Sequence, residues 1–328
     1  GSMDLRLALY ELAAEHRLED DASRRLEALA GFHRQPESLS RWLPIGIAGL
    51  AAALGGLGLI FWIAANWETL GRFGRFAVLE SAIVAMGLGA FWRAGARAAL
   101  SLVALLATGG LFAYFGQTYQ TGADPWQLFA LWAVLTLPLC LGLRSDLLWS
   151  PWALIVMTAI SLWVHAHTGH RWRVEPGDLA AHLAGWSAAL LVLGFLSSPL
   201  QRFTGAGVWA LRTAATLAVV IITLTALGGL FSRSVGTHYA FGLIVLAVAA
   251  AAFAARSSFD VFALSAVALG LNTLLVAGLG RLLFENSRGG DAIGSLFLLG
   301  AVAAGLLAAS VNGVLRLSRH HASQGASS

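Results

Sequence analysis

The sequence predicts an all-α fold: a polytopic helical membrane protein with about ten transmembrane helices preceded by a short cytoplasmic helical hairpin. The first observation is composition, since 58% of the 328 residues are hydrophobic and 12% are charged. An ordinary globular domain is about 45–50% apolar and about a quarter charged. The second observation is the recurrence of apolar runs long enough to cross a bilayer, and the third is a charged, amphipathic segment ahead of the first run.

Ten apolar runs follow residue 42, and each is bounded by charged or turn residues. A membrane-spanning helix needs about 20 predominantly apolar residues, and the runs are near this length. The second and fourth runs are short and Pro151 lies near the start of the fifth, so nine or eleven spans remain alternatives. The runs lie at 43–65, 76–92, 98–115, 128–143, 147–164, 179–196, 208–231, 239–255, 261–280 and 292–314.

The chain is predicted to have three parts, a cytoplasmic amphipathic helical hairpin at 3–41, a transmembrane bundle at 42–316 and a disordered tail at 317–328. Two apolar stripes at helical spacing define the hairpin. They consist of Leu5, Leu9 and Leu12, then Ala22, Leu26 and Leu29. The hairpin is either a solvated element beside the membrane or a docking site for a cytoplasmic protein partner, because short helices need a packing surface.

The distribution of charge predicts the orientation of the bundle. The net charge is +4, and all 21 basic residues are arginines that stand at the ends of apolar runs or in the first segment. This placement is typical of membrane topology, so membrane lipids are the predicted partners and nucleic acid is not. With the N-terminus inside, 14 arginines lie on the inner side and seven on the other. The positive-inside rule then places both termini in the cytoplasm.

Cysteine content and missing motifs limit the possible chemistry. The one cysteine, Cys140, lies in an apolar run, so no intramolecular disulfide, cysteine zinc cluster or cysteine-ligated iron–sulfur centre can form. The chain has no G-x-S-x-G elbow, P-loop or C-x-x-C motif, and no dinucleotide-binding glycine motif. No cofactor is predicted, and an enzyme is the least favoured class of function.

Two polar motifs are unusual inside so apolar a chain. They are N-W-E in GLIFWIAANWETLGRFGRFAVLE, residues 58–80, and G-Q-x-Y-Q-x-G-A-D in FGQTYQTGADPWQLFALWAVLTLPL, residues 115–139. Together with the amphipathic start, they resemble a family of bacterial predicted inner-membrane proteins, domain of unknown function 2157, over about the first half of the chain. The resemblance implies a bacterial inner-membrane location, and it implies no activity, substrate or catalytic residue.

The first set of candidate ligand-binding residues is Asn66, Trp67, Glu68 and Glu80. Glu80 lies about one turn inside the second apolar run, where an acidic side chain is costly unless it is paired or faces water. A structural role is the alternative. In that case Glu68 or Glu80 pairs with an arginine of the short connection, and Trp67 anchors the membrane interface.

The second set of candidates is Gln117, Tyr119, Gln120 and Asp124, in the connection between the third and fourth runs. The connection is rich in neutral hydrogen-bonding groups and has no basic residue, so it suits a polar ligand better than a phosphate. The alternative is a turn punctuated by glycine and proline. We expect both sets of candidates to gather around one outward-opening cavity with tryptophans at its rim.

Polar residues of the later runs are expected to be structural. His165, His167 and His170 are weak metal candidates, because nearby arginines oppose a cation, and a solvated loop is favoured. His182, Asn272 and the threonines of the seventh run are expected to form interhelical hydrogen bonds. No charged residue falls near the centre of any run, which disfavours an ion-coupled transporter.

The sequence therefore favours binding or transport of a small polar solute through a polar pocket near the outer membrane face. The alternative is a membrane scaffold or assembly subunit that recruits a partner through its cytoplasmic N-terminal hairpin.

Overall fold

A computed structural model describes residues 69–92, 95, 97–119, 124–169, 174–232, 236–286 and 292–325, together with residues 15, 22, 43, 44, 47, 48, 50, 51, 54, 55, 58, 62, 65 and 66. The chain divides into two compact units, Gly1–Leu54 and Gly55–Ser328. Apart from single positions, the first unit lies outside the described residues, and so does the predicted hairpin at 3–41. The helices below all belong to the second unit.

Every regular element that the structure describes is helical, which confirms the predicted all-α class. The long helices are α4 (Gly71–Trp92), α5 (Arg97–Tyr119), α6 (Pro125–Leu143), α7 (Asp146–Thr168), α8 (Leu179–Leu196), α10 (Val208–Leu230), α11 (Thr237–Ala254), α12 (Val261–Asn286) and α13 (Ala292–Gly325). The short ones are η2 (Pro176–Asp178), η3 (Ser198–Leu200), α9 (Gln201–Thr204) and η4 (Arg256–Ser258).

Among the described residues, 7 helices are long and apolar enough to cross a membrane. They are α6, α7, α8 with η2, α10, α11, α12 and α13, and they coincide with the fourth to the tenth predicted runs. Helices α4 and α5 coincide with the second and third runs, but their apolar stretches are shorter, Phe76–Met86 and Arg97–Leu111. The first run lies mostly outside the described residues. Seven of the ten predicted runs therefore correspond to helices that are long enough to cross a membrane, and the predicted count of about ten is not confirmed.

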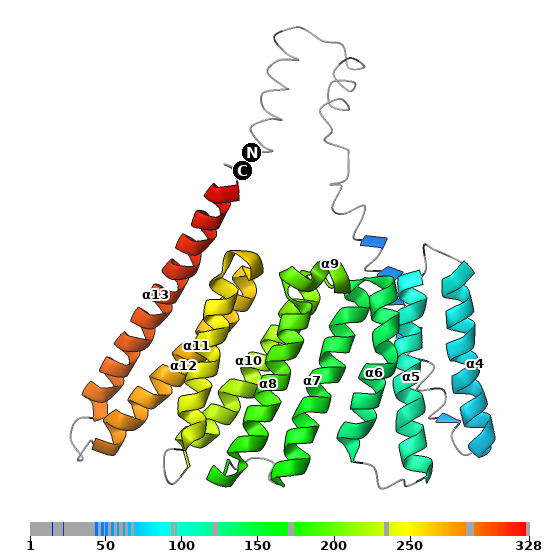
Figure 1. Cartoon of the computed structure of the whole chain (residues 1–328), viewed down its shortest axis with the longest axis horizontal. Coiled ribbons are helices and arrows are strands. Elements are labelled where there is room, and N and C mark those ends of the chain that lie inside the picture. The colour runs from blue at the N-terminus through cyan, green and yellow to red at the C-terminus, as the bar shows by residue number, and fades with distance from the viewer. Residues whose placement is uncertain are drawn as a thin grey trace. The chain divides into compact units, whose positions relative to one another are not determined.

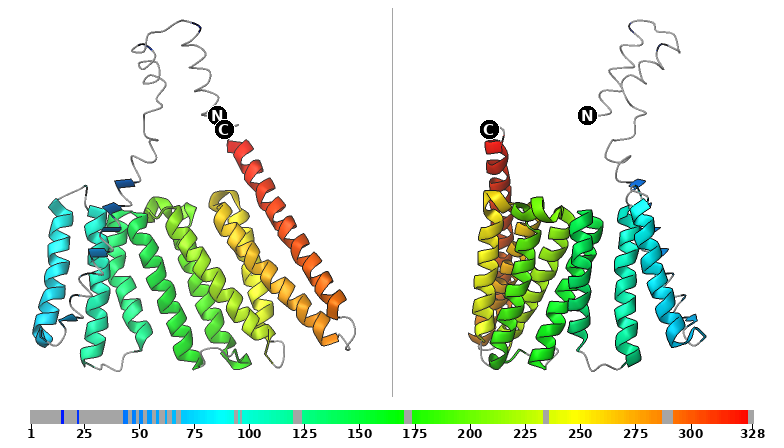
Figure 2. Two further views of the ribbon diagram at one scale, coloured as in Figure 1. Left: turned by 180° about the vertical axis from the view of Figure 1, so that it is seen from behind. Right: turned by 45° about the vertical axis from the view of Figure 1, so that its right-hand side comes forward.

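Successive long helices run in alternate directions, so their connections fall at two ends (Figure 1). Helix α10 contacts α7, α8, α11 and α12, while α13 packs mainly against α12, and α4 against α5. Figure 2 shows the same succession from behind. The C-terminal ends of α5, α7, α10 and α12 lie at one end, and this end includes the candidate site described below.

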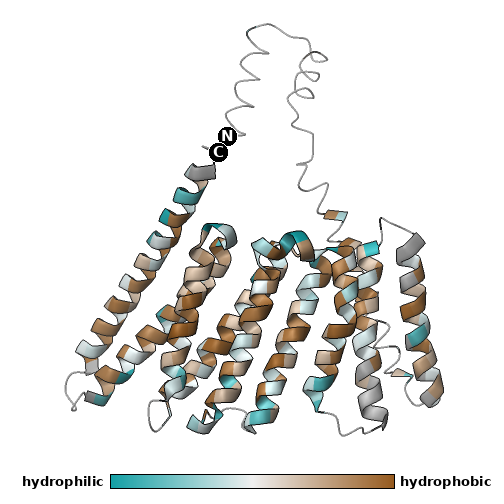
Figure 3. Ribbon diagram, in the orientation of Figure 1, coloured by the Kyte–Doolittle hydropathy of each residue, from teal (hydrophilic) through white to brown (hydrophobic). Residues whose placement is uncertain are grey.

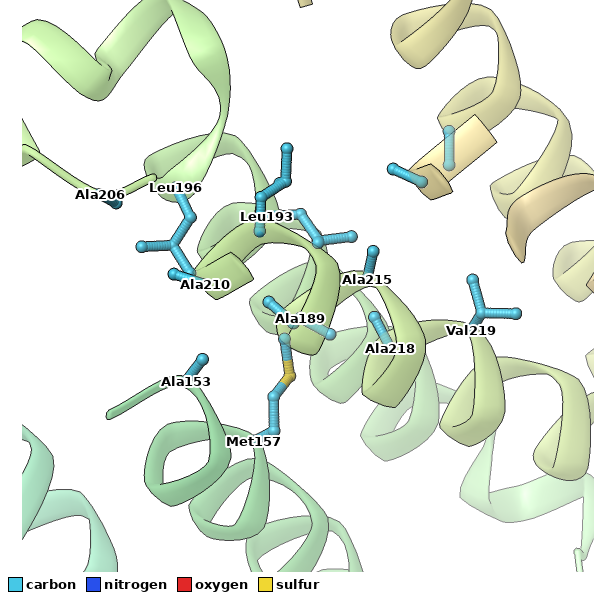
Figure 4. Packing of buried hydrophobic residues seen from close by; sticks show 14 of the residues in the cluster. Ala153, Met157, Ala189, Leu193, Leu196, Ala206, Ala210, Ala215, Ala218 and Val219 are labelled. Atoms are coloured by element: carbon cyan, nitrogen blue, oxygen red, sulfur yellow. The ribbon is translucent and has the colours of Figure 1, made fainter. Parts of the chain in front are cut away.

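Small residues build the core where α7, α8 and α10 meet (Figure 4). Ala210, Ala215 and Ala218 of α10 have no exposed surface, and they pack near Met157 of α7 and Leu193 of α8. Small side chains let helix backbones approach closely, which is how helices associate when lipid is as apolar as the helices themselves. Along the helices brown residues alternate with pale ones, and most of the teal, hydrophilic residues lie near helix ends (Figure 3).

Two residues at the connection of α6 and α7 hold the connection of α9 and α10. The Arg144 guanidinium donates a hydrogen bond to the backbone oxygen of Phe203 at 2.9 Å. The Asp146 carboxylate accepts hydrogen bonds from the backbone nitrogens of Gly207 at 2.6 Å and Trp209 at 3.0 Å. The first N–H groups of a helix have no intrahelical partner, so this carboxylate satisfies the start of α10 and complements its dipole.

The C-terminal part of the chain differs from its prediction. Helix α13 continues to Gly325, so the predicted disordered tail at 317–328 is helical as far as that residue. Nε2 of His321 lies 3.2 Å from the backbone oxygen of Ala254, and the His321 ring packs on Phe259. Polar composition predicted disorder there, but these contacts with the end of α11 and with Phe259 before α12 hold the last turns of α13 in place.

The threonines of α10 also differ from their prediction. Thr213, Thr216 and Thr225 donate to backbone carbonyls four residues earlier in their own helix, so the predicted interhelical bonds are wrong for these residues. The nearest acceptor to a helical threonine is a carbonyl of its own preceding turn. Asn272 does bond across helices, because its Nδ2 donates to Ser310 Oγ of α13 at 3.0 Å.

Candidate functional site

A polar cavity of about 350 Å³ lies where α7 ends, α8 begins and α10 ends. Its polar lining consists of Ser161, His165, Thr168, His182, Trp186 and Thr225. Three of these belong to α7, two to α8 and one to α10, so the cavity depends on how the three helices pack.

Local sequence signals bring the end of α7 next to the start of α8. Gly169 ends α7 with φ 69°, a left-handed conformation that glycine adopts without strain, and its N–H donates to the His165 carbonyl. Pro176 opens the short helix η2 just before α8, a position at which its missing N–H removes no hydrogen bond. The reversal places the last turns of α7 beside the first turns of α8.

Two hydroxyl groups in the cavity lack the bond that other hydroxyls of the bundle make. Thr158 of α7 and Thr225 of α10 each donate to a carbonyl four residues earlier at 2.7 Å. In the part of the chain that the structure describes, Ser161 and Thr168 have no hydrogen-bond partner. Thr168 is buried, where an unpaired hydroxyl is costly, whereas Ser161 is exposed on the side of α7 that lines the cavity. Both hydroxyls are available to water or to a bound molecule.

Two buried histidines from distant parts of the sequence meet at the cavity. His238 Nε2 lies 3.2 Å from His182 Nδ1, with 4.9 Å between the ring centroids and the rings edge to face. His182 Nδ1 also lies 3.0 Å from the backbone oxygen of Asp178. A carbonyl oxygen can only accept, so we assign the proton of the neutral His182 ring to Nδ1. His182 then has Nε2 as a hydrogen-bond acceptor for the cavity it lines.

The same assignment leaves buried polar atoms without partners. The one Nδ1 proton of His182 is then shared between the Asp178 carbonyl and His238 Nε2, and because His238 Nε2 accepts, the proton of the neutral His238 ring lies on its Nδ1. Within the described ranges this Nδ1, the indole Nε1 of Trp186 and one carboxylate oxygen of Asp178 are buried and form no hydrogen bond. Buried polar atoms in native proteins are nearly always bonded. The cluster is therefore complete only with water or a bound molecule.

A second cavity, of about 400 Å³, is apolar and lies between α6, α7 and α8. Trp126, Trp152 and Trp163 line it together with alanines and aliphatic residues. Gly185 lines both cavities, and the space that a Cβ atom would take there is filled by a methyl group of Val164. This close α7–α8 contact separates the two cavities, and the polar one has the hydrogen-bonding groups that chemistry or recognition needs.

Asn66 and Asp124, two of the described residues that were predicted to bind a ligand, line neither of the cavities above. The Asn66 amide donates to the backbone oxygen of Trp62 at 2.9 Å, which is a local bond. Asp124 is exposed directly before α6, and its carboxylate makes no capping hydrogen bond. Asn66 therefore stabilises a local turn through its bond to Trp62, and Asp124 stands at the start of α6.

Glu80 is exposed on α4 and lines neither cavity. The helix begins at Gly71, so Glu80 lies near its middle rather than one turn inside. Glu80 is closer to the centre of the helix than to the centre of the predicted run at 76–92, because the apolar pattern starts later than the helix does. Helix α4 begins at Gly71, so it has about one more turn, made of glycine, arginine and phenylalanine, before the apolar run that starts at residue 76.

The remaining predicted residues fall in or after α5. Gln117 and Tyr119 belong to its last turn, so this part of the motif is helix rather than a connecting loop. Trp67, Glu68 and Gln120 lie outside the described residues. The predicted convergence of the two motifs around one cavity stays a prediction.

The weak metal candidates are also placed differently from the prediction. His165 and His167 lie in the last turn of α7, and His170 lies outside the described residues. The His167 ring stacks on Trp163 with 4.2 Å between centroids. Over the described ranges, no three histidine, cysteine, aspartate or glutamate side chains form a group that could hold a metal ion.

Sequence reasoning predicted part of the polar cavity. The interhelical hydrogen bond of His182 is confirmed by its contact with His238. Ser161 and Thr168 were missed, although a signal existed: with His165 they occupy positions i, i+4 and i+7 of an apolar helix, which places all three on one face.

The two unusual motifs of the first half lie in a stretch of the chain that matches a family model. Residues 10–149 match DUF2157, a predicted membrane protein. The match confirms the resemblance over that stretch, and together with the seven helices that are long and apolar enough to cross a membrane it indicates a multi-pass membrane protein. No curated protein and no solved structure matches the chain. The DUF2157 match ends before the first residue that lines the polar cavity.

Proposed function

We propose that the protein binds a small neutral polar solute in the cavity between α7, α8 and α10, as a binding or transport protein. The observation that carries this proposal is the set of hydrogen-bonding groups without a protein partner in the described chain: the hydroxyls of Ser161 and Thr168 and Nε2 of His182. The volume of about 350 Å³ is in the range of small-molecule sites.

The lining favours an uncharged solute. None of the described residues that line the cavity is an aspartate, glutamate, lysine or arginine, so a bound ion would lose its hydration without gaining a counter-charge from the lining. His182 Nε2 requires a donor on the solute, and the two hydroxyls can each donate or accept. A polyol or a primary amide has both kinds of group.

We place this site at the outer face of a bacterial inner membrane, with both termini in the cytoplasm. The arginine distribution supports this orientation, because more arginines lie on the side of the N-terminus. The C-terminal end of α7 and the start of α8 then face outward, and the cavity lies at these helix ends.

Cysteine accessibility tests whether the cavity is water-filled and open to the outside. In a Cys140→Ala background, Ser161→Cys is expected to react with externally added 2-sulfonatoethyl methanethiosulfonate in intact cells. The matched control is Ser187→Cys, an exposed position on α8 that lines neither cavity. Both serines lie roughly 10–12 Å from their helix ends, so depth in the bilayer is the same.

The expected rate for Ser161→Cys is at least about ten times that for Ser187→Cys, because the reactive thiolate forms where water reaches the sulfur. Equal rates would remove the case for a water-filled cavity. Reaction of Ser161→Cys only after the cells are opened would reverse the proposed orientation.

A double variant tests binding itself. Ser161→Ala with Thr168→Val removes both unpaired hydroxyls without breaking a hydrogen bond in the described chain. We expect a panel of glycerol, erythritol, urea and acetamide to contain a solute that raises the unfolding temperature of the wild-type protein by linkage. Its affinity for the double variant is expected to be about tenfold lower.

The control for this measurement is Thr216→Val, which lies on α10 outside the cavity and should leave solute affinity unchanged. If none of the four solutes stabilises the wild-type protein, or if the double variant is stabilised equally, the proposed function is wrong.

A further inference from the structure

A groove of about 840 Å³ runs between α12 and α13, separate from the polar cavity. Its walls are largely apolar, with Leu269, Val276 and Phe284 on α12 and Leu299, Ala303 and Leu307 on α13. Helix α13 packs mainly against α12 and is the last long helix of the succession (Figure 1). The groove is therefore on the outside of the described bundle, where it meets lipid.

An ion pair closes one end of the groove. Arg281 Nε donates to Glu285 Oε1 at 2.7 Å, and Arg281 Nη1 donates to the backbone oxygen of Ser232 at 3.3 Å. Both charged residues line the groove, with the Arg281 side chain 14% exposed and that of Glu285 58% exposed. The guanidinium is held in place by these bonds, and the second oxygen of Glu285 and Nη2 of Arg281 remain for a ligand.

The polar residues in the middle of the groove need no ligand. Asn272 is bonded to Ser310 of α13, and Thr273 donates to the Leu269 carbonyl at 2.8 Å. With these bonds made, the inner half of the groove presents mainly apolar surface, and the charges stand at the end of α12.

The length of the groove matches one leaflet of a bilayer. From Glu285 to Leu269 it follows α12 for about 24 Å at 1.5 Å per residue. Half a bilayer with its headgroup region is about 20–22 Å thick. A helix from a second copy of the chain would follow the full thickness of the membrane, whereas one lipid occupies one leaflet.

We propose that this groove binds one zwitterionic glycerophospholipid of the surrounding membrane. The phosphate accepts from the Arg281 guanidinium, and the ammonium group of an ethanolamine headgroup donates to Glu285. One acyl chain lies along the apolar wall past Ala303. The opposite charges of Arg281 and Glu285 complement those of the headgroup, and a charge-assisted phosphate contact is the strongest bond this end of the groove can offer.

Retention of a defined lipid by the purified full chain tests the proposal. The protein is delipidated in detergent, given equal amounts of palmitoyl-oleoyl phosphatidylethanolamine and palmitoyl-oleoyl glycerol, and examined by native mass spectrometry. We expect at least about tenfold more phosphatidylethanolamine adduct, because the two lipids differ only in the phosphate headgroup. Arg281→Gln is expected to remove most of this preference.

A pair of neighbouring substitutions tests the acyl-chain wall. Ala303→Phe fills the groove, whereas Ala304→Phe adds the same ring at an exposed position that does not line it. Ala303→Phe should lower the adduct about tenfold and Ala304→Phe should leave it unchanged, with equal unfolding temperatures as the check on folding. Equal retention by both variants, or equal retention of the two lipids by the wild-type protein, would overturn the proposal. So would a dimer that Ala303→Phe dissociates without affecting lipid, since a second copy would then occupy the groove.

Discussion

Replacing Trp149 with alanine is expected to lower the free energy of unfolding by about 3–5 kcal/mol. The indole is fully buried near the start of α7 and donates from Nε1 to the backbone oxygen of Thr204 at 3.0 Å. It also packs edge-on against Trp152 and Phe195, with centroids 5.2 and 5.7 Å away. Alanine would leave a cavity among these rings and an unpaired carbonyl on α9.

The measurement is reversible unfolding of the purified protein in mixed micelles with increasing sodium dodecyl sulfate. Trp209→Ala is the matched control, because the Trp209 side chain is 59% exposed and its ring contacts the Arg212 guanidinium at 5.4 Å. Its loss is expected to cost less than about 1 kcal/mol. If the two variants lose the same stability, the packing around Trp149 is not as described.

Asp146→Ala is expected to cost about 2–3 kcal/mol in the same measurement. The carboxylate accepts two backbone hydrogen bonds at the start of α10, and alanine would leave both N–H groups without a partner near the membrane interface. Asp146→Asn keeps one neutral acceptor oxygen and should fall between alanine and the wild-type protein.

The chain offers a second aspartate at a helix start as the control. Asp124 directly precedes α6, but its side chain is exposed and forms no capping bond. Asp124→Ala is therefore expected to change stability by no more than about 0.5 kcal/mol. A cost for Asp124→Ala as large as that for Asp146→Ala would mean that helix-start charge alone, rather than the bonds to Gly207 and Trp209, stabilises the bundle.

Composition and apolar run length determined the class of this protein and the positions of its later helices. The predicted runs at 179–196 and 208–231 agree with α8 and α10 within one residue. This works because an apolar bilayer requires about 20 apolar residues per span and leaves polar residues to the connections. The interhelical bonds of His182 and Asn272 were predictable for a related reason, since a polar side chain inside a span seeks a partner.

Tertiary structure alone decided which polar groups are satisfied and which are available. Thr225 and Thr168 look alike in sequence, yet Thr225 is bonded to its own helix and Thr168 is not. His182 and His238 are 56 positions apart in the chain, and they meet only because α8 and α11 pack together. The physical reason is that lipid and protein interior are equally apolar, so hydropathy does not tell which face of a helix meets a neighbour. Helix packing chose those faces, and with them the polar cavity and the groove beside α13.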